Sequence, residues 1–134
     1  MRGAATPLMQ VNTVEELQVW QAAVRFVAAV SAVTCGDRMS RDLRLRDQID
    51  ACADSVLSNL AEGFEQGTDR GFARYLYIAR GSCSEARAHL TVAQLRGAVT
   101  PEASAELRQD ATQVIQMLTG LIEYLHRSDR KQRR

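Results

Sequence analysis

Apolar residues recur at intervals of three and four along four stretches of the 134-residue chain. This period is typical of amphipathic helices that bury one face. The first stretch opens with Thr13 and Glu16, a capping-box pair, and ends near Gly36. Its expected apolar stripe consists of Leu17, Trp20, Val24, Val27 and Ser31, with Ala23, Val30 and Thr34 beside it.

Three further helices are predicted. The second spans about residues 42–64. The third opens at the N-cap Thr68 and stops at Gly97, and the fourth opens with Thr100 and Pro101 and ends at His126. The third has the most regular heptad seam, which consists of Phe72, Leu76, Ala79, Cys83, Ala86, Leu90 and Ala93.

Four helices with short connections predict an all-α fold, an antiparallel up-down-up-down four-helix bundle. We expect a flexible N-terminal lead-in over residues 1–12, the bundle over residues 13–127 and a basic C-terminal tail over residues 128–134. A short charged terminus of this kind is most often disordered.

The formal charge of +1 is unevenly distributed. Residues 127–134 carry five basic residues against Asp129, which leaves 12 basic and 15 acidic residues, or −3, in residues 1–126. A bundle of this charge does not by itself indicate a polyanion-binding surface, whereas the tail could neutralise phosphates.

The three cysteines, Cys35, Cys52 and Cys83, are an odd number without CxxC spacing and are expected to be reduced thiols. The chain has neither a signal peptide nor an apolar run long enough to cross a bilayer. We therefore expect no membrane association and a cytoplasmic location.

Polar residues interrupt the apolar pattern where the second helix ends and the third passes it. We expect a hydrogen-bonded network there, because unpaired polar groups cost about 1–3 kcal/mol each when buried. Its favoured role is to fix helix register and subunit packing. The expected members are Asn59, Glu62, Arg80, Ser82 and Glu85.

A second stripe flanks the seam of the third helix and mixes apolar with polar residues, as subunit contacts do. This candidate oligomer face consists of Tyr75, Ile78, Ser82, Glu85 and His89.

Basic groups on the third helix and in the tail are candidate nucleic-acid contacts. They are Arg70, Arg74, Arg87, Arg130, Lys131, Arg133 and Arg134, with Tyr77, Arg80 and Ser84 on the same flank of the third helix. The favoured alternative is that Glu62, Asp69, Glu85 and the acids of the second helix neutralise the arginines of the third.

Candidate chemistry is sparse. Glu123 and His126 form one Glu-x-x-His motif, of which a di-iron bundle site needs two. Glu123, however, lies off the apolar seam. Cys83 and His89 are six residues apart and point away from each other on a helix. We expect no catalytic residue, metal site or cofactor.

Three segments resemble the bacterial four helix bundle proteins, also called ribosomal RNA intervening-sequence proteins. They are residues 17–23 (LQVWQAA), 58–64 (SNLAEGF) and 75–85 (YLYIARGSCSE), within a resemblance that covers residues 14–127. The resemblance implies a homopentameric four-helix bundle without known enzymatic activity. Some relatives are encoded inside intervening sequences of large-subunit ribosomal RNA genes. Distant relatives include retroelement accessory proteins that bind a reverse transcriptase and nucleic acid.

The leading hypothesis is a non-enzymatic, pentameric assembly protein that binds RNA or an RNA-handling partner. One alternative is a structural or regulatory oligomer that recognises another protein without binding nucleic acid. The other is a small metal-dependent enzyme.

Overall fold

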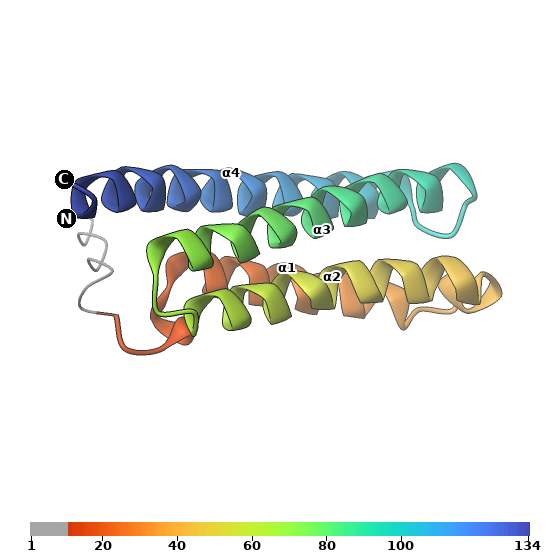
Figure 1. The fold of residues 1–134 in the computed structure, drawn as a ribbon. Coiled ribbons are helices and arrows are strands. Elements are labelled where there is room, and N and C mark those ends of the chain that lie inside the picture. The colour runs from red at the N-terminus through yellow and green to blue at the C-terminus, as the bar shows by residue number, and fades with distance from the viewer. Residues whose placement is uncertain (1–10) are drawn as a thin grey trace, which may run out of the picture.

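A computed structural model describes residues 11–134 of the chain. Its α-helices are α1 (Gln18–Thr34), α2 (Leu43–Phe64), α3 (Asp69–Leu95) and α4 (Pro101–Gln132). Single-turn 3₁₀-helices precede the first two, namely η2 (Val14–Glu16) and η3 (Met39–Arg41). The four helices alternate in direction along a common axis, which confirms the predicted all-α up-down-up-down bundle (Figure 1). Most of the predicted lead-in, residues 1–10, lies outside the described residues.

Each helix packs against two neighbours, in the ring order α1, α2, α3, α4. In Figure 1, α1 and α2 form one layer and α3 and α4 the other. The α2–α3 and α3–α4 seams are the most extensive. The third helix therefore contributes to both major seams, and it carries most of the candidate site residues.

Side-chain caps are present at three helix starts, and two of them, Thr68 and Thr100, were predicted. Asp42, Thr68 and Thr100 accept hydrogen bonds from backbone N–H groups in the first turns of α2, α3 and α4. At the start of the chain, the Thr13 hydroxyl instead donates to the Glu16 carboxylate over 3.4 Å, in the 3₁₀ turn that precedes α1. At the end of α3, Gly97 has a φ of 74°, where a residue without Cβ is favoured.

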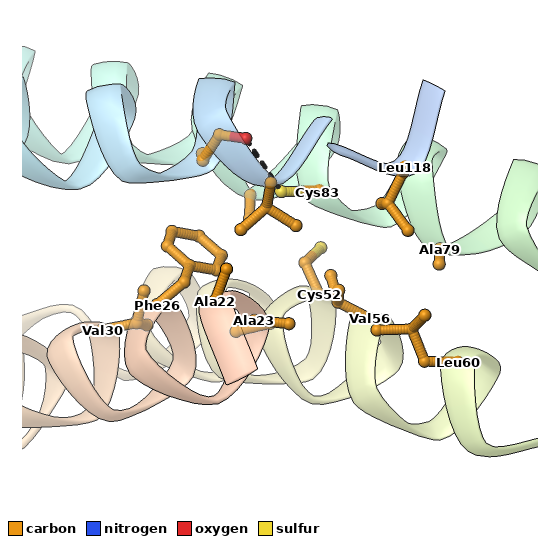
Figure 2. Close-up of a cluster of buried hydrophobic side chains, with 14 of the residues drawn as sticks. Ala22, Ala23, Phe26, Val30, Cys52, Val56, Leu60, Ala79, Cys83 and Leu118 are labelled. Carbon is orange, nitrogen blue, oxygen red and sulfur yellow. Dashed lines mark hydrogen bonds between the residues drawn. The ribbon is translucent and has the colours of Figure 1, made fainter. Parts of the chain in front are cut away.

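The core is formed by small and branched side chains from all four helices (Figure 2). Every member of the predicted seam of α3 is buried, including Leu76, Cys83 and Leu90, each at 0% exposure. On α4, the buried line includes Leu118, Ile122 and Leu125, whereas Leu121 is only partly buried. Full burial of one aliphatic side chain stabilises the fold by about 1.5–3 kcal/mol.

The predicted stripe of the first helix is wrong in phase. Val24 is 40% exposed and Ser31 is also exposed. The buried line of α1 instead consists of Val19, Ala22, Ala23, Phe26, Val30 and Thr34. Leu17, the first residue of the predicted stripe, has extended backbone (ψ 133°) and separates the 3₁₀ turn from α1. Phe26, the largest fully buried side chain, lies on the buried line and points into the core (Figure 2).

The predicted end of the fourth helix is also wrong. Helix α4 continues past His126 to Gln132, so most of the basic tail is helical. An ion pair between Arg133 and Asp129, four residues apart, lies in this extension. Such pairs stabilise exposed helices by a few tenths of a kcal/mol. In Figure 1 the end of α4 extends beyond the start of α3.

Gly63 allows α2 and α3 to approach closely. A Cβ atom at this position would lie 2.7 Å from Tyr75 Cβ and 3.0 Å from Phe72 Cδ1. The phenyl rings of Phe64 and Phe72 meet edge to face beside it, with centroids 6.0 Å apart. The glycine of the SNLAEGF segment is therefore a packing residue.

Among the residues that the structure describes, no helix combines the length and hydropathy needed to cross a membrane.

Candidate nucleic-acid interface

The α2–α3 seam contains three of the five expected network residues. Asn59 Nδ2 donates to the Ser55 carbonyl at 2.8 Å and approaches Ser55 Oγ at 3.0 Å. Ser55 Oγ and Ser82 Oγ share a hydrogen bond of 2.8 Å between the two helices. One turn further along, the Cys52 thiol donates to Glu85 Oε2 over 2.9 Å. The polar residues of the seam thus set the register of α2 against α3.

Glu62 and Arg80 lie outside this network. The Glu62 side chain is exposed, and only its backbone carbonyl accepts a bond, from Gln66. Arg80 is two residues from Ser82 and so lies about 200° around the helix from it, facing α4. Cys52 and Ser55 were not among the predicted members, although Ser55 precedes Asn59 by four residues and Cys52 precedes Ser55 by three along α2.

The candidate oligomer face follows the edge of α3 nearest α2. Ser82 is occupied by its bond to Ser55, and Tyr75 lies next to Gly63. Ile78 is 47% exposed and Glu85 is exposed. Tyr75 and Ser82 therefore contact α2, whereas Ile78 and Glu85 are accessible on the surface of the single chain.

A row of arginines lies in the opposite seam, between α3 and α4. Arg80 Nη1 donates to Thr119 Oγ1 at 3.2 Å, and Arg87 Nη1 donates to Thr112 Oγ1 at 3.1 Å. From α4, Arg108 donates to Ser104 and to Gln94 Oε1. All three arginines are half-buried. We call Arg80, Arg87 and Arg108 the groove arginines.

The threonine hydroxyls are oriented as acceptors. Thr119 Oγ1 donates its proton to the Ile115 carbonyl and Thr112 Oγ1 to the Arg108 carbonyl, both at 2.9 Å. Each hydroxyl oxygen can then accept from an arginine. A guanidinium has five N–H donors, and Arg87 has one partner in the described residues, so most of its donors remain for a ligand.

Among the residues that the structure describes, no acidic side chain forms an ion pair with this row. The ion pairs among residues 11–134 are Arg46–Asp47, Arg70–Asp129, Arg96–Asp42 and Arg133–Asp129. The expectation that acids of α2 and α3 would pair with the third-helix arginines is therefore wrong for Arg80 and Arg87. Arg70 is paired, but with Asp129 of α4 at 3.5 Å. Antiparallel packing explains the difference, because it places threonines of α4, rather than acids, opposite Arg80 and Arg87.

An aromatic residue extends the row. Tyr77 is 45% exposed, and Arg80 lies over its ring at 5.0 Å from the centroid, a cation–π distance. Tyr77 Oη and His126 Nε2 are 2.9 Å apart. His126 is therefore part of this seam, whereas Glu123, the other residue of the half di-iron motif, is exposed on α4.

A surface groove of about 470 Å³ lies at the Arg87 end of the row. Its polar lining comes from both helices: Ser84, Arg87, Thr91, Arg108, Gln109 and Thr112. The remaining candidate contacts are placed differently. Arg74 is exposed on α3, and Arg130, Lys131, Arg133 and Arg134 are exposed at the end of α4. Sequence reasoning missed Arg108, Thr112 and Thr119, which recur along one side of α4.

The three cysteines differ in environment, and all are unpaired thiols. Cys83 is fully buried and donates to the Ala111 carbonyl at 3.4 Å (Figure 2). Burial raises the pKa of the Cys83 thiol to about 12, so it is not a nucleophile near neutral pH. Burial, followed by the hydrogen bond and charge of Glu85, raises the pKa of Cys52 to about 12. Cys35 is exposed.

One group of metal-ligating side chains was missed. Cys52 of α2 and Glu85 and His89 of α3 place one donor atom each within 4.8 Å of the others. Cys52 is far from Glu85 and His89 in the sequence, so this group can be recognised only from the register of α2 against α3.

The family model of the 23S rRNA-intervening sequence protein matches residues 15–120. The fold is similar to the crystal structure of a protein of unknown function from the S23 ribosomal protein family of Bacteroides thetaiotaomicron. The similarity has a TM-score of 0.70 at 18% identity and covers 78% of this chain and 97% of that one. No curated protein matches the sequence. Since the family model spans most of the bundle, the chain belongs to the 23S rRNA-intervening sequence protein family.

Proposed function

We propose that the protein binds RNA through the groove between α3 and α4, and that it acts by binding rather than by catalysis. The observation that carries this proposal is the row of groove arginines, which meet threonine hydroxyls and amides instead of carboxylates. Half-buried cations without a paired acid favour an anionic ligand, because a phosphate replaces the water that they have partly lost.

The spacing of the row suits a nucleic-acid backbone. Arg80 and Arg87 are two helical turns apart, which separates them by about 10 Å along the groove. Each can therefore contact a different phosphate of one strand.

An unpaired base is the second element of the ligand. Tyr77 offers an exposed ring beside Arg80, and single-stranded nucleic acids combine base stacking on aromatic rings with phosphates in a basic groove. Stacking of this kind contributes about 1–3 kcal/mol per base. We therefore propose single-stranded or looped RNA as the ligand class.

The proposed assembly is a homopentamer, as the family resemblance implies. Exposed apolar residues support self-association: Ile78 on the candidate oligomer face is 47% exposed, and Leu43 and Leu95 are 54% and 81% exposed. Leu43 and Leu95 share one end of the bundle, since their neighbours Asp42 and Arg96 form an ion pair of 3.1 Å. Light scattering that gives a monomer would contradict the pentamer.

The same apolar residues support the second candidate function, an oligomer that recognises another protein. The unpaired thiols of all three cysteines support a cytoplasmic site of action for either function, because reduced thiols persist there.

The decisive experiment is a salt titration of binding to a fluorescent, unstructured RNA. Each lost phosphate contact reduces the slope of log K against log salt by about 0.7 for a single strand. Arg80→Gln and Arg87→Gln should each weaken binding and lower this slope. The matched control is Arg25→Gln, which removes the same charge from an exposed site on α1. Equal effects of all three substitutions would refute the groove, and no binding at low salt would remove RNA as the ligand.

A further inference from the structure

A cysteine, a glutamate and a histidine meet at the edge of the α2–α3 seam, far around α3 from the groove arginines. Their donor atoms, one from each side chain, all lie within 4.8 Å of one another. The closest pair is Cys52 Sγ and Glu85 Oε2 at 2.9 Å. Nitrogen, oxygen and sulfur donors together are typical of sites for Zn²⁺ and related cations.

The helices hold these residues in place without help from a ligand. Glu85 and His89 are four residues apart and so lie on one face of α3. Cys52 is brought opposite Glu85 by the register of α2, which the Ser55–Ser82 bond fixes one turn away. The close approach at Gly63 maintains the same register further along. The group therefore rests on two helices and a packed seam rather than on loops.

The distances nearly match a tetrahedral ion. Ligand bonds of about 2.0–2.3 Å place the donors of a tetrahedral zinc roughly 3.3–3.8 Å apart. The largest donor separation here, at most 4.8 Å, needs to shrink by about 1 Å, which a rotation of the half-exposed His89 side chain can supply. The hydrogen-bonded Cys52 and Glu85 need only move apart slightly.

Access and burial also suit a metal site. Cys52 is 8% exposed, so its sulfur lies at the base of the group, whereas Glu85 is exposed and His89 half-buried. An ion can therefore enter from the Glu85 side and retain water as its fourth ligand. On binding, the thiol proton now shared with Glu85 leaves to solvent, and the sulfur binds the ion as thiolate.

We propose that Cys52, Glu85 and His89 bind one Zn²⁺-class divalent cation, which joins α2 to α3 at the outer edge of their seam. This role is a structural clamp. It is independent of the RNA proposal, because it involves none of the groove residues.

Cobalt(II) is the probe, since a thiolate ligand gives it a near-ultraviolet charge-transfer band and a tetrahedral site gives visible absorption. The titration uses the full chain carrying Cys35→Ser, because the exposed Cys35 could bind the probe itself. We expect one cobalt ion per chain, displacement by zinc, and a higher unfolding temperature with metal. Cys52→Ser should abolish the charge-transfer band, and Glu85→Gln or His89→Gln should weaken binding more than about tenfold.

Two controls make the result specific. Cys83→Ser removes a buried thiol outside the group, and Glu62→Gln removes an exposed carboxylate near the end of the same seam. Both should bind cobalt as the parent does. If no thiolate band appears, or if it survives Cys52→Ser, the proposal is wrong. Circular dichroism of each variant establishes that it is folded, and His89→Gln, at a half-exposed position, tests the site even if Cys52→Ser unfolds.

Discussion

Arg87 of α3 donates to Thr112 of α4 across 3.1 Å, and this hydroxyl donates in turn to the Arg108 carbonyl. The contact holds the guanidinium in the seam without neutralising its charge. An arginine paired with a carboxylate would present little net charge to a ligand. A structural hydrogen bond and an anion-binding surface are therefore compatible in one residue.

Replacing Thr112 by Val separates these two roles. The substitution keeps the shape but removes the acceptor of Arg87, so the free energy of unfolding should fall by about 0.5–1.5 kcal/mol. RNA affinity should change less than threefold, because the charge of Arg87 is retained. Chemical denaturation and the salt titration measure the two effects. A loss of RNA binding as large as that of Arg87→Gln would show that the hydroxyl, rather than the cation, is required.

Replacing Asp129 by Asn should strengthen RNA binding. Asp129 pairs with Arg70 and Arg133 at 3.5 and 3.2 Å, and its loss leaves both cations available for phosphates. The stability cost should be below about 1 kcal/mol, because both pairs are at the surface. The salt slope should become steeper. Asp47→Asn, which frees Arg46 on α2, is the matched control and should leave RNA binding unchanged.

Two glycine substitutions should have opposite effects on stability. In Gly63→Ala the new methyl group would lie 2.7 Å from Tyr75 Cβ, so α2 and α3 must separate. We expect a loss of about 1–3 kcal/mol. In Gly81→Ala the methyl group meets nothing within 4 Å on α3, and helix propensity should add about 0.5–1 kcal/mol. Equal effects in thermal or chemical unfolding would contradict the close α2–α3 approach.

The stability of the metal-free protein should fall as the pH rises above about 9. The folded pKa of Cys83 is about 12, against an ordinary value of 9.0. Below pH 9 both states keep the proton, whereas between about pH 9 and 12 only the folded state keeps it. Unfolding therefore releases a proton in that range and becomes more favourable.

The measurement is the pH dependence of the unfolding free energy between pH 8 and about 11, with chelator present. Cys83→Ala should reduce the slope by up to one proton, whereas Cys35→Ser, at an exposed site, is the control and should leave it unchanged. An unchanged slope in Cys83→Ala would show that the buried thiol titrates normally.

Local sequence signals predicted much of the fold correctly. Thr68 and Thr100 cap α3 and α4 as their side chains and positions indicate, and the α3 seam is buried over its whole length. A cap and the apolar face of a helix are both defined by residues only three or four positions apart. The amino-acid sequence therefore contains the information needed to predict them. The predicted stripe of α1 failed because apolar residues occur on more than one side of this helix. Val24 is exposed whereas Phe26 and Val30 are buried, and apolar spacing alone does not decide which line faces the core.

The sequence by itself determined the helices, most of their buried faces and the family. The tertiary structure alone decided which polar residues meet: Arg80 with Thr119, Ser55 with Ser82, and Cys52 with Glu85 and His89. The physical reason is that periodicity fixes the face of one helix, whereas contacts between helices also require their relative register. That register depends on close packing at residues such as Gly63, which the spacing of apolar residues does not encode.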